Sequence, residues 1–541
     1  FGTTGSSNTA LGACTLGGGE VNTGDNNIAI GRKSMFLNAT GADNVAIGNA
    51  TLQNNTTASN NTAVGFKALI ANTTGAINTS VGACSLCHNT TGTRNTAVGF
   101  CALHENTNND NTAFGSSSLR DNTSGTRNVA IGPNAMRNAT TADCNTAIGV
   151  SAMQNSSTGN DNVGIGNGAL QSNGTGCRNT AVGSLAGDAI TTGHENTAVG
   201  HKALTSATTS CGNVAVGMCS LHNHTTGGDN NAIGMCSQFT TSTGAANNSM
   251  GHKSMELNTT GNSNVAIGEQ SLRRNTTACN NTALGSEALC ANTTGTENIA
   301  VGRKALKANT TGGANTAVGL NALLDATTAG NNTAVGVEAL QNVTTGTGSN
   351  VAVGRSAGEG ITTGCFNTMI GFRAGSSTTT VEGNTFIGKS AGCNAVSGNS
   401  NLALGINSGI DAVKNITGSD THQIVIGNNS STNAFIKIDW TVTSDLRDKT
   451  EIEDVPHGLD FVNKITPIKY KFKKSREDDT PHGTKKYGFK AQEILALEGD
   501  NPVIIDNHDL ENLKITGGHL IPILVNAIKE LKAEIELLKN K

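Results

Sequence analysis

The amino-acid sequence predicts a mainly β chain in which a repetitive β-solenoid is followed by a smaller mixed domain that ends in a helix. Glycines aligned with Gly65 recur every 17 residues up to Gly405, with one step of 16 before Gly115 and one of 18 before Gly354. Such a period over most of a chain indicates a solenoid, in which each repeat buries its apolar side against its neighbours. In addition, the composition changes after residue 430, and the C-terminal end carries a heptad pattern.

Each repeat reads Asn-Thr-Ala-Val-Gly, two variable residues, Ala or Ser before Leu, two more variable residues and Asn-Thr-Thr-Gly. Aliphatic residues precede each repeat glycine and recur four positions after it, as ladders of inward-facing side chains require. The first ladder contains Val64, Val81, Val98 and Ile131, and the second contains Leu69, Leu86, Leu103 and Met136. Because Gly and the Asn-Thr-Thr-Gly group are turn residues, we expect roughly 23 short-stranded coils with both ladders inside.

The composition excludes several classes of protein. With 68 glycines in 541 residues, 3% aromatic and 14% charged residues, the chain lacks the bulky side chains of several ordinary domains. Regularly placed Val, Ile and Leu argue against disorder. A net charge of -4 without a basic stripe favours neither nucleic acid nor membrane binding, and no apolar run is long enough to span a bilayer. The chain starts at Phe1 within a repeat, so we expect a fragment of a longer protein.

Each coil buries little apolar surface for its length, so a single thin solenoid is expected to be only marginally stable. Its apolar side is therefore expected to be shared between chains. The repeats resemble the head repeats of trimeric autotransporter adhesins, most closely in residues 44–48, 128–132 and 264–268, which all read Asn-Val-Ala-Ile-Gly. This resemblance implies a left-handed parallel β-roll that packs as a trimer. The repeats are also similar to those of tail-fibre-like proteins of viruses and bacteria.

All 13 cysteines lie in the array, and an odd number cannot pair completely within one chain. Cys84 and Cys101, like Cys219 and Cys236, occupy equivalent positions in successive repeats, where stacking would bring their Cα atoms within disulfide range. We expect most of the thiols to be free, with a disulfide at either pair as the alternative.

Three short patterns in the array resemble functional motifs. Residues 84–88 read Cys-Ser-Leu-Cys-His and fit the haem-attachment pattern, but the Ser and Leu are consensus repeat residues. A second group lacks the ligand spacing of a closed zinc site; it contains Cys219, His222, His224 and Cys236. Residues 164–166 have no βαβ context for a nucleotide loop. We therefore predict no metal site and no cofactor.

Asn-x-Thr/Ser sequons occur in most repeats, for example at Asn72 and Asn292. Turns and hydrogen-bonded ladders explain these residues, whereas N-glycosylation requires a secretory or viral route. Flat Thr ladders are a possible ice-binding face, although charged residues such as Arg303 and Lys304 interrupt their regularity.

The last 101 residues contain five of the six prolines, both tyrosines and no cysteine, as in an ordinary mixed domain. Alternating apolar residues predict strands at 436–442 and 468–472, and the polar residues 475–484 are expected to form a hairpin or a projecting arm. The chain ends in a helix with Pro522 in its first turn. A heptad seam of this kind favours two-stranded coils, although the attached domain can override that preference. The seam contains Leu524, Ile528, Leu531, Ile535 and Leu538.

The candidate chemistry lies at residues 444–449, which read Ser-Asp-Leu-Arg-Asp-Lys. A serine with a lysine five residues later can form a nucleophile and a base if the segment turns back on itself, because a desolvated lysine can lose its charge and accept the hydroxyl proton. A solvated charged turn is the simpler interpretation of these six residues alone.

The motifs around this segment favour the catalytic interpretation, because their order resembles that of the intramolecular chaperones of endosialidases and phage tail fibres. The matching segments are 444–452, 458–461, 465–470, 488–493 and 527–531. The resemblance covers residues 443–541 and implies a trimeric, mostly helical chaperone. Such a chaperone assembles the preceding β-fibre and then cuts itself off before the motif serine.

The resemblance also implies roles for individual residues. Ser444 is the nucleophile, Lys449 is the general base, and the bond that is cut joins Thr443 to Ser444. Asp445 and Arg447 match motif positions with supporting roles. The implied enzyme activity is a single self-cleavage per chain, without turnover and without a metal or a cofactor.

Asp448 stands where the family often has an apolar residue, which bears on the efficiency of cleavage. We expect a fibre over residues 1–430, a junction strand and cleavage linker over 431–443, and the chaperone over 444–541. The expected protein is a homotrimeric fibre outside the cell, on a virion or a cell surface, that attaches a virus to a glycan or protein receptor on its host. It is expected to bind no nucleic acid and not to insert into membranes. The alternatives are a bacterial adhesin, a structural spacer or, less favoured, an ice-binding solenoid.

Overall fold

The computed structural model describes residues 4–18, 21–411, 414–418, 420–431, 434–435, 437, 444–473, 476, 478–500, 502–508 and 510–540. The chain has two compact units, Phe1–Phe366 and Asn367–Lys541. The strand expected at 436–442 depends on Ile436, Ile438, Trp440 and Val442, which lie outside the described residues, as does Thr443.

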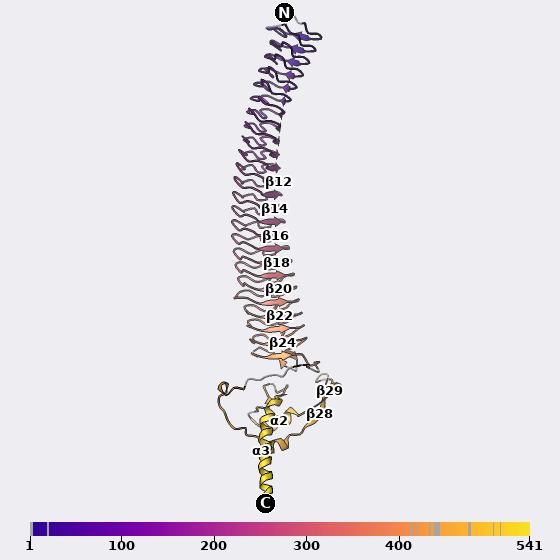
Figure 1. The fold of residues 1–541 in the computed structure, drawn as a ribbon, viewed down its shortest axis with the longest axis vertical. Helices are drawn as coiled ribbons and strands as arrows, with labels where there is room; N and C mark the ends of the chain where they lie inside the picture. Colours follow the sequence, from indigo (N-terminus) through magenta and orange to yellow (C-terminus); the bar gives the residue numbers. More distant parts are fainter. Residues whose placement is uncertain are drawn as a thin grey trace. The chain divides into compact units, whose positions relative to one another are not determined.

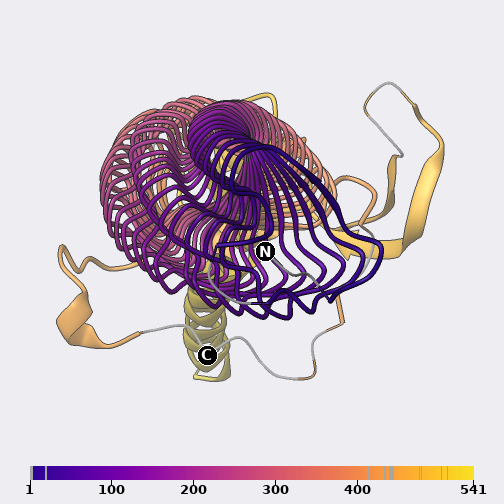
Figure 2. The same ribbon diagram turned by 90° about the horizontal axis from the view of Figure 1, so that it is seen from above.

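The first unit is a stack of parallel three-residue strands, one for each repeat (Figure 1). Its strands are β1 (Thr9–Leu11), β2 (Ile28–Ile30), β3 (Val45–Ile47), β4 (Thr62–Val64), β5 (Thr79–Val81), β6 (Thr96–Val98), β7 (Thr112–Phe114), β8 (Val129–Ile131), β9 (Thr146–Ile148), β10 (Val163–Ile165), β11 (Thr180–Val182), β12 (Thr197–Val199), β13 (Val214–Val216), β14 (Asn231–Ile233), β15 (Asn248–Met250), β16 (Val265–Ile267), β17 (Thr282–Leu284), β18 (Ile299–Val301), β19 (Thr316–Val318), β20 (Thr333–Val335) and β21 (Val351–Val353). Each strand pairs in register with the strand of the next repeat, as Ala63 does with Ser80. Figure 2 shows these coils lying one above another with a gradual rotation along the stack.

The second unit begins with four further three-residue strands that pair in parallel, namely β22 (Thr368–Ile370), β23 (Thr385–Ile387), β24 (Leu402–Leu404) and β27 (Ile424–Ile426). Between the last two, β25 (Ile410–Asp411) and β26 (Lys414–Asn415) pair antiparallel. The predicted repetitive 17-residue β-solenoid is therefore confirmed.

The C-terminal part of this unit contains short helices, two antiparallel strand pairs and one long helix. Its elements are η1 (Leu446–Asp448), α1 (Leu459–Lys464), β28 (Ile468–Lys473), β29 (Pro481–Gly488), α2 (Ala491–Glu498), β30 (Ile505–Asp506), β31 (Lys514–Ile515), η2 (Gly517–His519) and α3 (Leu520–Lys539). β28 and β29 form the expected hairpin, but β29 begins at Pro481, so residues 481–484 belong to a strand and not to the predicted loop. Pro522 lies in the first turn of α3, as predicted.

Fewer large side chains of each coil face its interior than the sequence pattern predicts. Side chains alternate along a strand, so the two outer residues of a three-residue strand share one face, and it is the middle residue that points inward. In β4 this residue is Ala63, which is fully buried, whereas Thr62 is exposed and Val64 is only half-buried. The prediction that the aliphatic residue before each glycine faces inward is wrong for Val64, Val81, Val98 and Ile131. The other predicted ladder is confirmed, because Leu69, Leu86, Leu103 and Met136 are fully buried.

Two ladders of buried asparagines fill much of the remaining interior. Asn61 Nδ2 donates to Asn44 Oδ1 one coil before it, and Asn61 Oδ1 accepts a hydrogen bond from Asn78 Nδ2 one coil after it (3.2 and 3.1 Å). In the second ladder, Asn72 Nδ2 donates to Asn55 Oδ1 at 3.0 Å. Both ladders also bond the backbone, since Asn61 and Asn72 donate to the same carbonyl oxygen, that of Gly75 (3.0 and 2.9 Å). The sequon residues Asn72 and Asn292 are thus buried hydrogen-bonding groups, as the ladder interpretation predicts.

The repeat glycines allow neighbouring coils to approach closely. Gly65 has φ of 136°, and a Cβ atom built on it would lie 2.6 Å from the carbonyl oxygen of Gly82. Any side chain here would therefore collide with the backbone of the next coil, in a conformation that L residues rarely adopt. The 17-residue glycine period is a direct consequence of coil stacking.

Several positions in each coil place larger residues in the left-handed region of the backbone. In the coil that contains β4, Lys67, Leu69 and Ile77 have φ of 55°, 51° and 61°. Such conformations are strained for bulky or β-branched side chains. The turns are therefore set by the stack as a whole and not by the local preference of each residue.

Replacing Ile77 by Asn is expected to stabilise the folded array by about 1 kcal/mol, because Asn tolerates the left-handed region far better than a β-branched residue. Ile77 is exposed, so little packing is lost, and Asn60 already occupies the equivalent position one coil earlier with φ of 63°. Thermal and denaturant unfolding measure the difference. Ile77→Thr keeps the β-branch and serves as the control; an equal gain from Thr would contradict the strain argument.

The C-terminal domain has its own apolar core. Its buried residues come from α1, α2, α3 and the segment around β30, and they are Phe461, Ile494, Ile504, Ile505, Leu520 and Ile523. The heptad seam of α3 does not contribute to this core, since Leu524 and Leu531 are 44% and 45% exposed and Ile528 is 66% exposed. None of the helices in the described part of the chain is long and apolar enough to cross a membrane.

Candidate functional site

The structure brings Ser444 and Lys449 together at the start of the C-terminal domain. Between them, the three residues of η1 form a single tight turn in which Lys449 N–H donates to the carbonyl oxygen of Leu446 at 3.2 Å. This turn reverses the chain, and the Nζ atom of Lys449 donates a hydrogen bond to Ser444 Oγ at 2.8 Å. The distance suits a nucleophile and its proton acceptor.

Asp445 and Arg447 hold the turn in shape. Asp445 is the N-cap of η1, and its Oδ1 atom accepts a hydrogen bond from Arg447 N–H at 2.9 Å. The Arg447 guanidinium binds the same carboxylate, with Nη2 2.6 Å from Oδ2. These two interactions, first the guanidinium and then the backbone N–H, hold the pKa of Asp445 below its usual range. The carboxylate therefore stays ionised and positions the turn through its bonds to Arg447.

Both members of the pair are exposed in the single chain. In the hydrogen bond between them, the lysine is the donor. To accept a proton from serine, a lysine has to be desolvated. The two side chains lie within hydrogen-bond distance, but neither is buried within the single chain. Asp448, the residue that departs from the family pattern, is exposed.

Two carboxylates that the sequence interpretation did not assign support the domain around this site. Glu530 of α3 accepts a hydrogen bond from Leu459 N–H at the start of α1, at 2.6 Å. Glu498, at the end of α2, accepts from the N–H groups of Val503, Ile504 and Ile505 at 2.8, 2.6 and 3.0 Å. Glu530 lies within one of the matching segments, but no spacing rule marks Glu498, because its partners are backbone groups.

The structure shows what surrounds the histidines and cysteines of the motif-like patterns in the array. His224 is buried, and its Nε2 lies 2.5 Å from the carbonyl oxygen of Gly227, whereas the ring of His222 stacks on Phe239. The suggested zinc group around these histidines therefore does not come together. All thirteen cysteines lie in described ranges and all are free thiols, as expected. In contrast, the segment 84–88 brings Cys87 and His88 close to His104 of the next coil.

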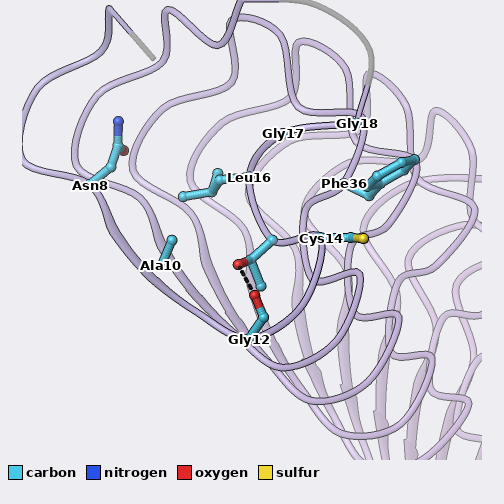
Figure 3. A pocket seen from close by; sticks show the side chains of 9 residues that line it. Asn8, Ala10, Gly12, Cys14, Leu16, Gly17, Gly18 and Phe36 are labelled. Carbon is cyan, nitrogen blue, oxygen red and sulfur yellow. Dashed lines mark hydrogen bonds between the residues drawn. The ribbon is translucent and has the colours of Figure 1, made fainter. Parts of the chain in front are cut away.

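A pocket lies at the N-terminal end of the first unit (Figure 3). Small and apolar side chains of the first coils line it, including Ala10, Leu16 and Phe36. Its one side-chain hydrogen bond between lining residues joins Thr15 Oγ1 to the carbonyl oxygen of Gly12 at 2.9 Å. The pocket contains none of the predicted site residues and is the inner face of the first coil.

Comparison with known families identifies the C-terminal region. Residues 444–501 match the model of a family described as chaperone of endosialidase. No curated protein and no solved structure matches the chain. The matched region begins at Ser444 and contains the turn with Lys449. The expectation of a repetitive β-fibre with a C-terminal chaperone is thus confirmed, and this combination fits a tail-fibre-like trimeric protein.

Proposed function

We propose that the chain is one subunit of a homotrimeric surface fibre, and that its C-terminal domain drives trimer assembly and then cuts the chain before Ser444. The observation that carries this proposal is the 2.8 Å hydrogen bond between Lys449 Nζ and Ser444 Oγ. It lies at the first residues of the segment that matches the chaperone of endosialidase family.

Two unpartnered apolar surfaces support a trimer. One runs along the stack, where the third residue of each strand points outward, for example Ile47 and Ile131, each 38% exposed. The other is the seam of α3, where Leu531 and Ile535 are exposed although their spacing is that of a coiled coil. Contiguous apolar patches of this kind mark association surfaces. Assembly covers both surfaces.

The proposed cut proceeds through an ester. Ser444 Oγ attacks the carbonyl carbon of residue 443 while Lys449 accepts the hydroxyl proton, and the peptide C–N bond breaks as Lys449 returns the proton to the departing amine of Ser444. Water then hydrolyses the ester, which leaves a carboxylate on residue 443 and a free hydroxyl on Ser444. Assembly desolvates Lys449, so the cut follows trimer formation and occurs once per chain.

A direct test measures the native mass of the freshly folded protein together with the masses of its denatured chains. We expect three copies of the 54.9 kDa chain per particle, followed by the appearance of a fragment of residues 444–541 without added protease. Replacing Leu531 and Ile535 by Glu is expected to give uncut monomers, because the charges disrupt the seam. Lys529→Glu, at an exposed position on the side of the helix away from the seam, is the matched control and should assemble and cut normally. A stable monomer of the unmodified protein would contradict the trimer.

We further assign the fibre to the outside of a virion or a cell, where it attaches a virus to a host-surface glycan or protein. This assignment rests on the long repetitive array joined to a chaperone of the endosialidase type. Binding of purified fibre to cells or to a glycan array measures attachment. A fibre that assembles but binds neither cells nor glycans would favour a spacer. A fibre that only joins bacterial cells to one another would favour an adhesin. Inhibition of ice recrystallisation would favour the ice-binding alternative.

A further inference from the structure

A cluster of metal-ligating side chains lies on the array, where the coils that begin at Gly82 and Gly99 stack on one another. Cys87 and His88 lie on the first coil and His104 and Glu105 on the second, in each case directly after the buried leucine. The backbone fixes this arrangement, because His88 N–H donates to the carbonyl oxygen of His104 at 3.0 Å. Four potential ligands therefore occupy two neighbouring positions on two neighbouring coils.

The side chains of three of them converge. One ligand atom each from Cys87, His88 and His104 lies within 4.8 Å of the other two. The two imidazole rings meet edge to face with their centroids 4.6 Å apart. Cys87 is buried and His88 is exposed, so the cluster lies at the surface with its thiol on the inner side.

Glu105 adds a feature that is typical of metal sites. Its carboxylate contacts both rings, with Oε1 2.8 Å from His104 Nδ1 and Oε2 3.3 Å from His88 Nδ1. A carboxylate on one ring nitrogen fixes the tautomer and leaves the other nitrogen free to bind a cation. Glu105 can therefore orient both histidines at once.

We propose that Cys87, His88 and His104 bind one transition-metal ion of the zinc class, with Glu105 as the orienting carboxylate. Thiolate and imidazole are the ligands that Zn²⁺ prefers, and three protein ligands leave the fourth tetrahedral position open for water or another group. Ligand atoms around one such ion lie roughly 3.3 to 3.8 Å apart, so small side-chain rotations complete the site.

The same repeat positions elsewhere lack this arrangement. Cys290 occupies the position of Cys87 in a later coil, but the charged groups near it are not histidines; they are Arg273, Glu287, Lys307 and Arg274. His222 occupies the position of His104, but its ring stacks on Phe239. The cluster is therefore not a by-product of the repeat.

A bound ion would join two successive coils through their side chains. The second of these coils is the one shortened to 16 residues, which changes the turn after Asn106. The site thus stabilises the array at an irregular repeat.

Titration of the full-length protein, kept reduced by a phosphine, with Zn²⁺ alone and with Co²⁺ as a spectroscopic probe tests the proposal. We expect one ion per chain, a thiolate-to-cobalt charge-transfer band, and a melting temperature that rises with Zn²⁺ concentration. Cys87→Ser should abolish the band, and His88→Gln or His104→Gln should lower Zn²⁺ affinity by about 100-fold or more. Glu105→Gln should lower it by about 10 to 100-fold.

Cys290→Ser is the matched control, since it removes a half-buried thiol at the same repeat position and should leave binding unchanged. Circular dichroism of each variant without metal shows whether the array still folds. Absence of stoichiometric Zn²⁺ binding by the reduced protein would overturn the proposal. Unchanged binding in a folded variant that lacks all three ligands would also overturn it.

Discussion

Ser444→Ala is expected to leave the chain in one piece while the protein still folds and assembles as a trimer. Removing Oγ removes the proposed nucleophile, so the rate of self-cleavage should fall by about a thousand-fold or more. Ser444 is exposed, so the change costs little stability. Intact-mass analysis of the denatured chains after assembly gives the fraction cut.

Two variants of Lys449 distinguish a role of its positive charge from a role in proton transfer. Lys449→Ala and Lys449→Arg should both block the cut, although Arg keeps the positive charge, because a guanidinium does not give up its proton in proteins. Thr450→Ala alters the exposed residue beside Lys449 and serves as the control that should still be cut. Cleavage that persists in Ser444→Ala would refute the assigned nucleophile. No cleavage in the assembled, unmodified protein would mean that the chaperone lacks a peptidase step.

Gly302→Ala is expected to destabilise the array by roughly 2 to 6 kcal/mol, the sum of backbone strain and overpacking. Gly302 has φ of 131°, and an added Cβ would lie 2.5 Å from the carbonyl oxygen of Gly319. The obstacle is backbone, so no side-chain rotation relieves it, and the coils on either side have to separate. Denaturant unfolding measures the loss, and limited proteolysis should show new cuts near residues 302–319.

Gly313→Ala provides the matched comparison within the same coil. The nearest atom to its added Cβ is the carbonyl oxygen of Thr296 at 3.1 Å, and the residue does not have a positive φ. Thr296 itself occupies the equivalent position one coil earlier. We expect a change of less than about 1 kcal/mol. Equal losses at the two glycines would show that coil contact at Gly302 is not the cause.

The coil and its 17-residue period could be predicted from the sequence because stacking requires the same residue types at the same positions of every coil. Gly302 and its equivalents keep their period since each touches the backbone of the next coil, and Leu69 and its equivalents keep theirs since each fills the interior. The direction of Val64 could not be obtained in this way. An outward aliphatic ladder recurs as regularly as an inward one, so the period does not tell whether Ala63 or its two neighbours face the interior, and the structure places Ala63 inside.

The candidate site was predictable for a different reason. The spacing of Ser444 and Lys449 indicated a pair only if the chain turned back, and the clamp between Asp445 and Arg447 provides that turn. The support from Glu498 was not predictable, because a carboxylate that binds three backbone N–H groups leaves no pattern in the sequence. The cluster at Cys87 was also missed, since His104 lies one coil away and the haem-like pattern at 84–88 was considered only with residues adjacent to it in the sequence.

The outward aliphatic ladder has a further consequence for how three chains align in the proposed trimer. The third residue of each strand, such as Ile47 or Ile131, presents a similar aliphatic side chain on every coil, so the outer face of one coil is nearly indistinguishable from that of the next. Neighbouring chains displaced lengthwise by one coil, about 4.8 Å, would meet almost equivalent surfaces. Repetition therefore makes stacking within each chain strong, but it leaves several lengthwise alignments of neighbouring chains almost equal in energy. In the proposed trimer the correct alignment has to be imposed from a non-repeating part of the chain, and a chaperone at the C-terminal end would provide a common starting point from which all coils are paired in step.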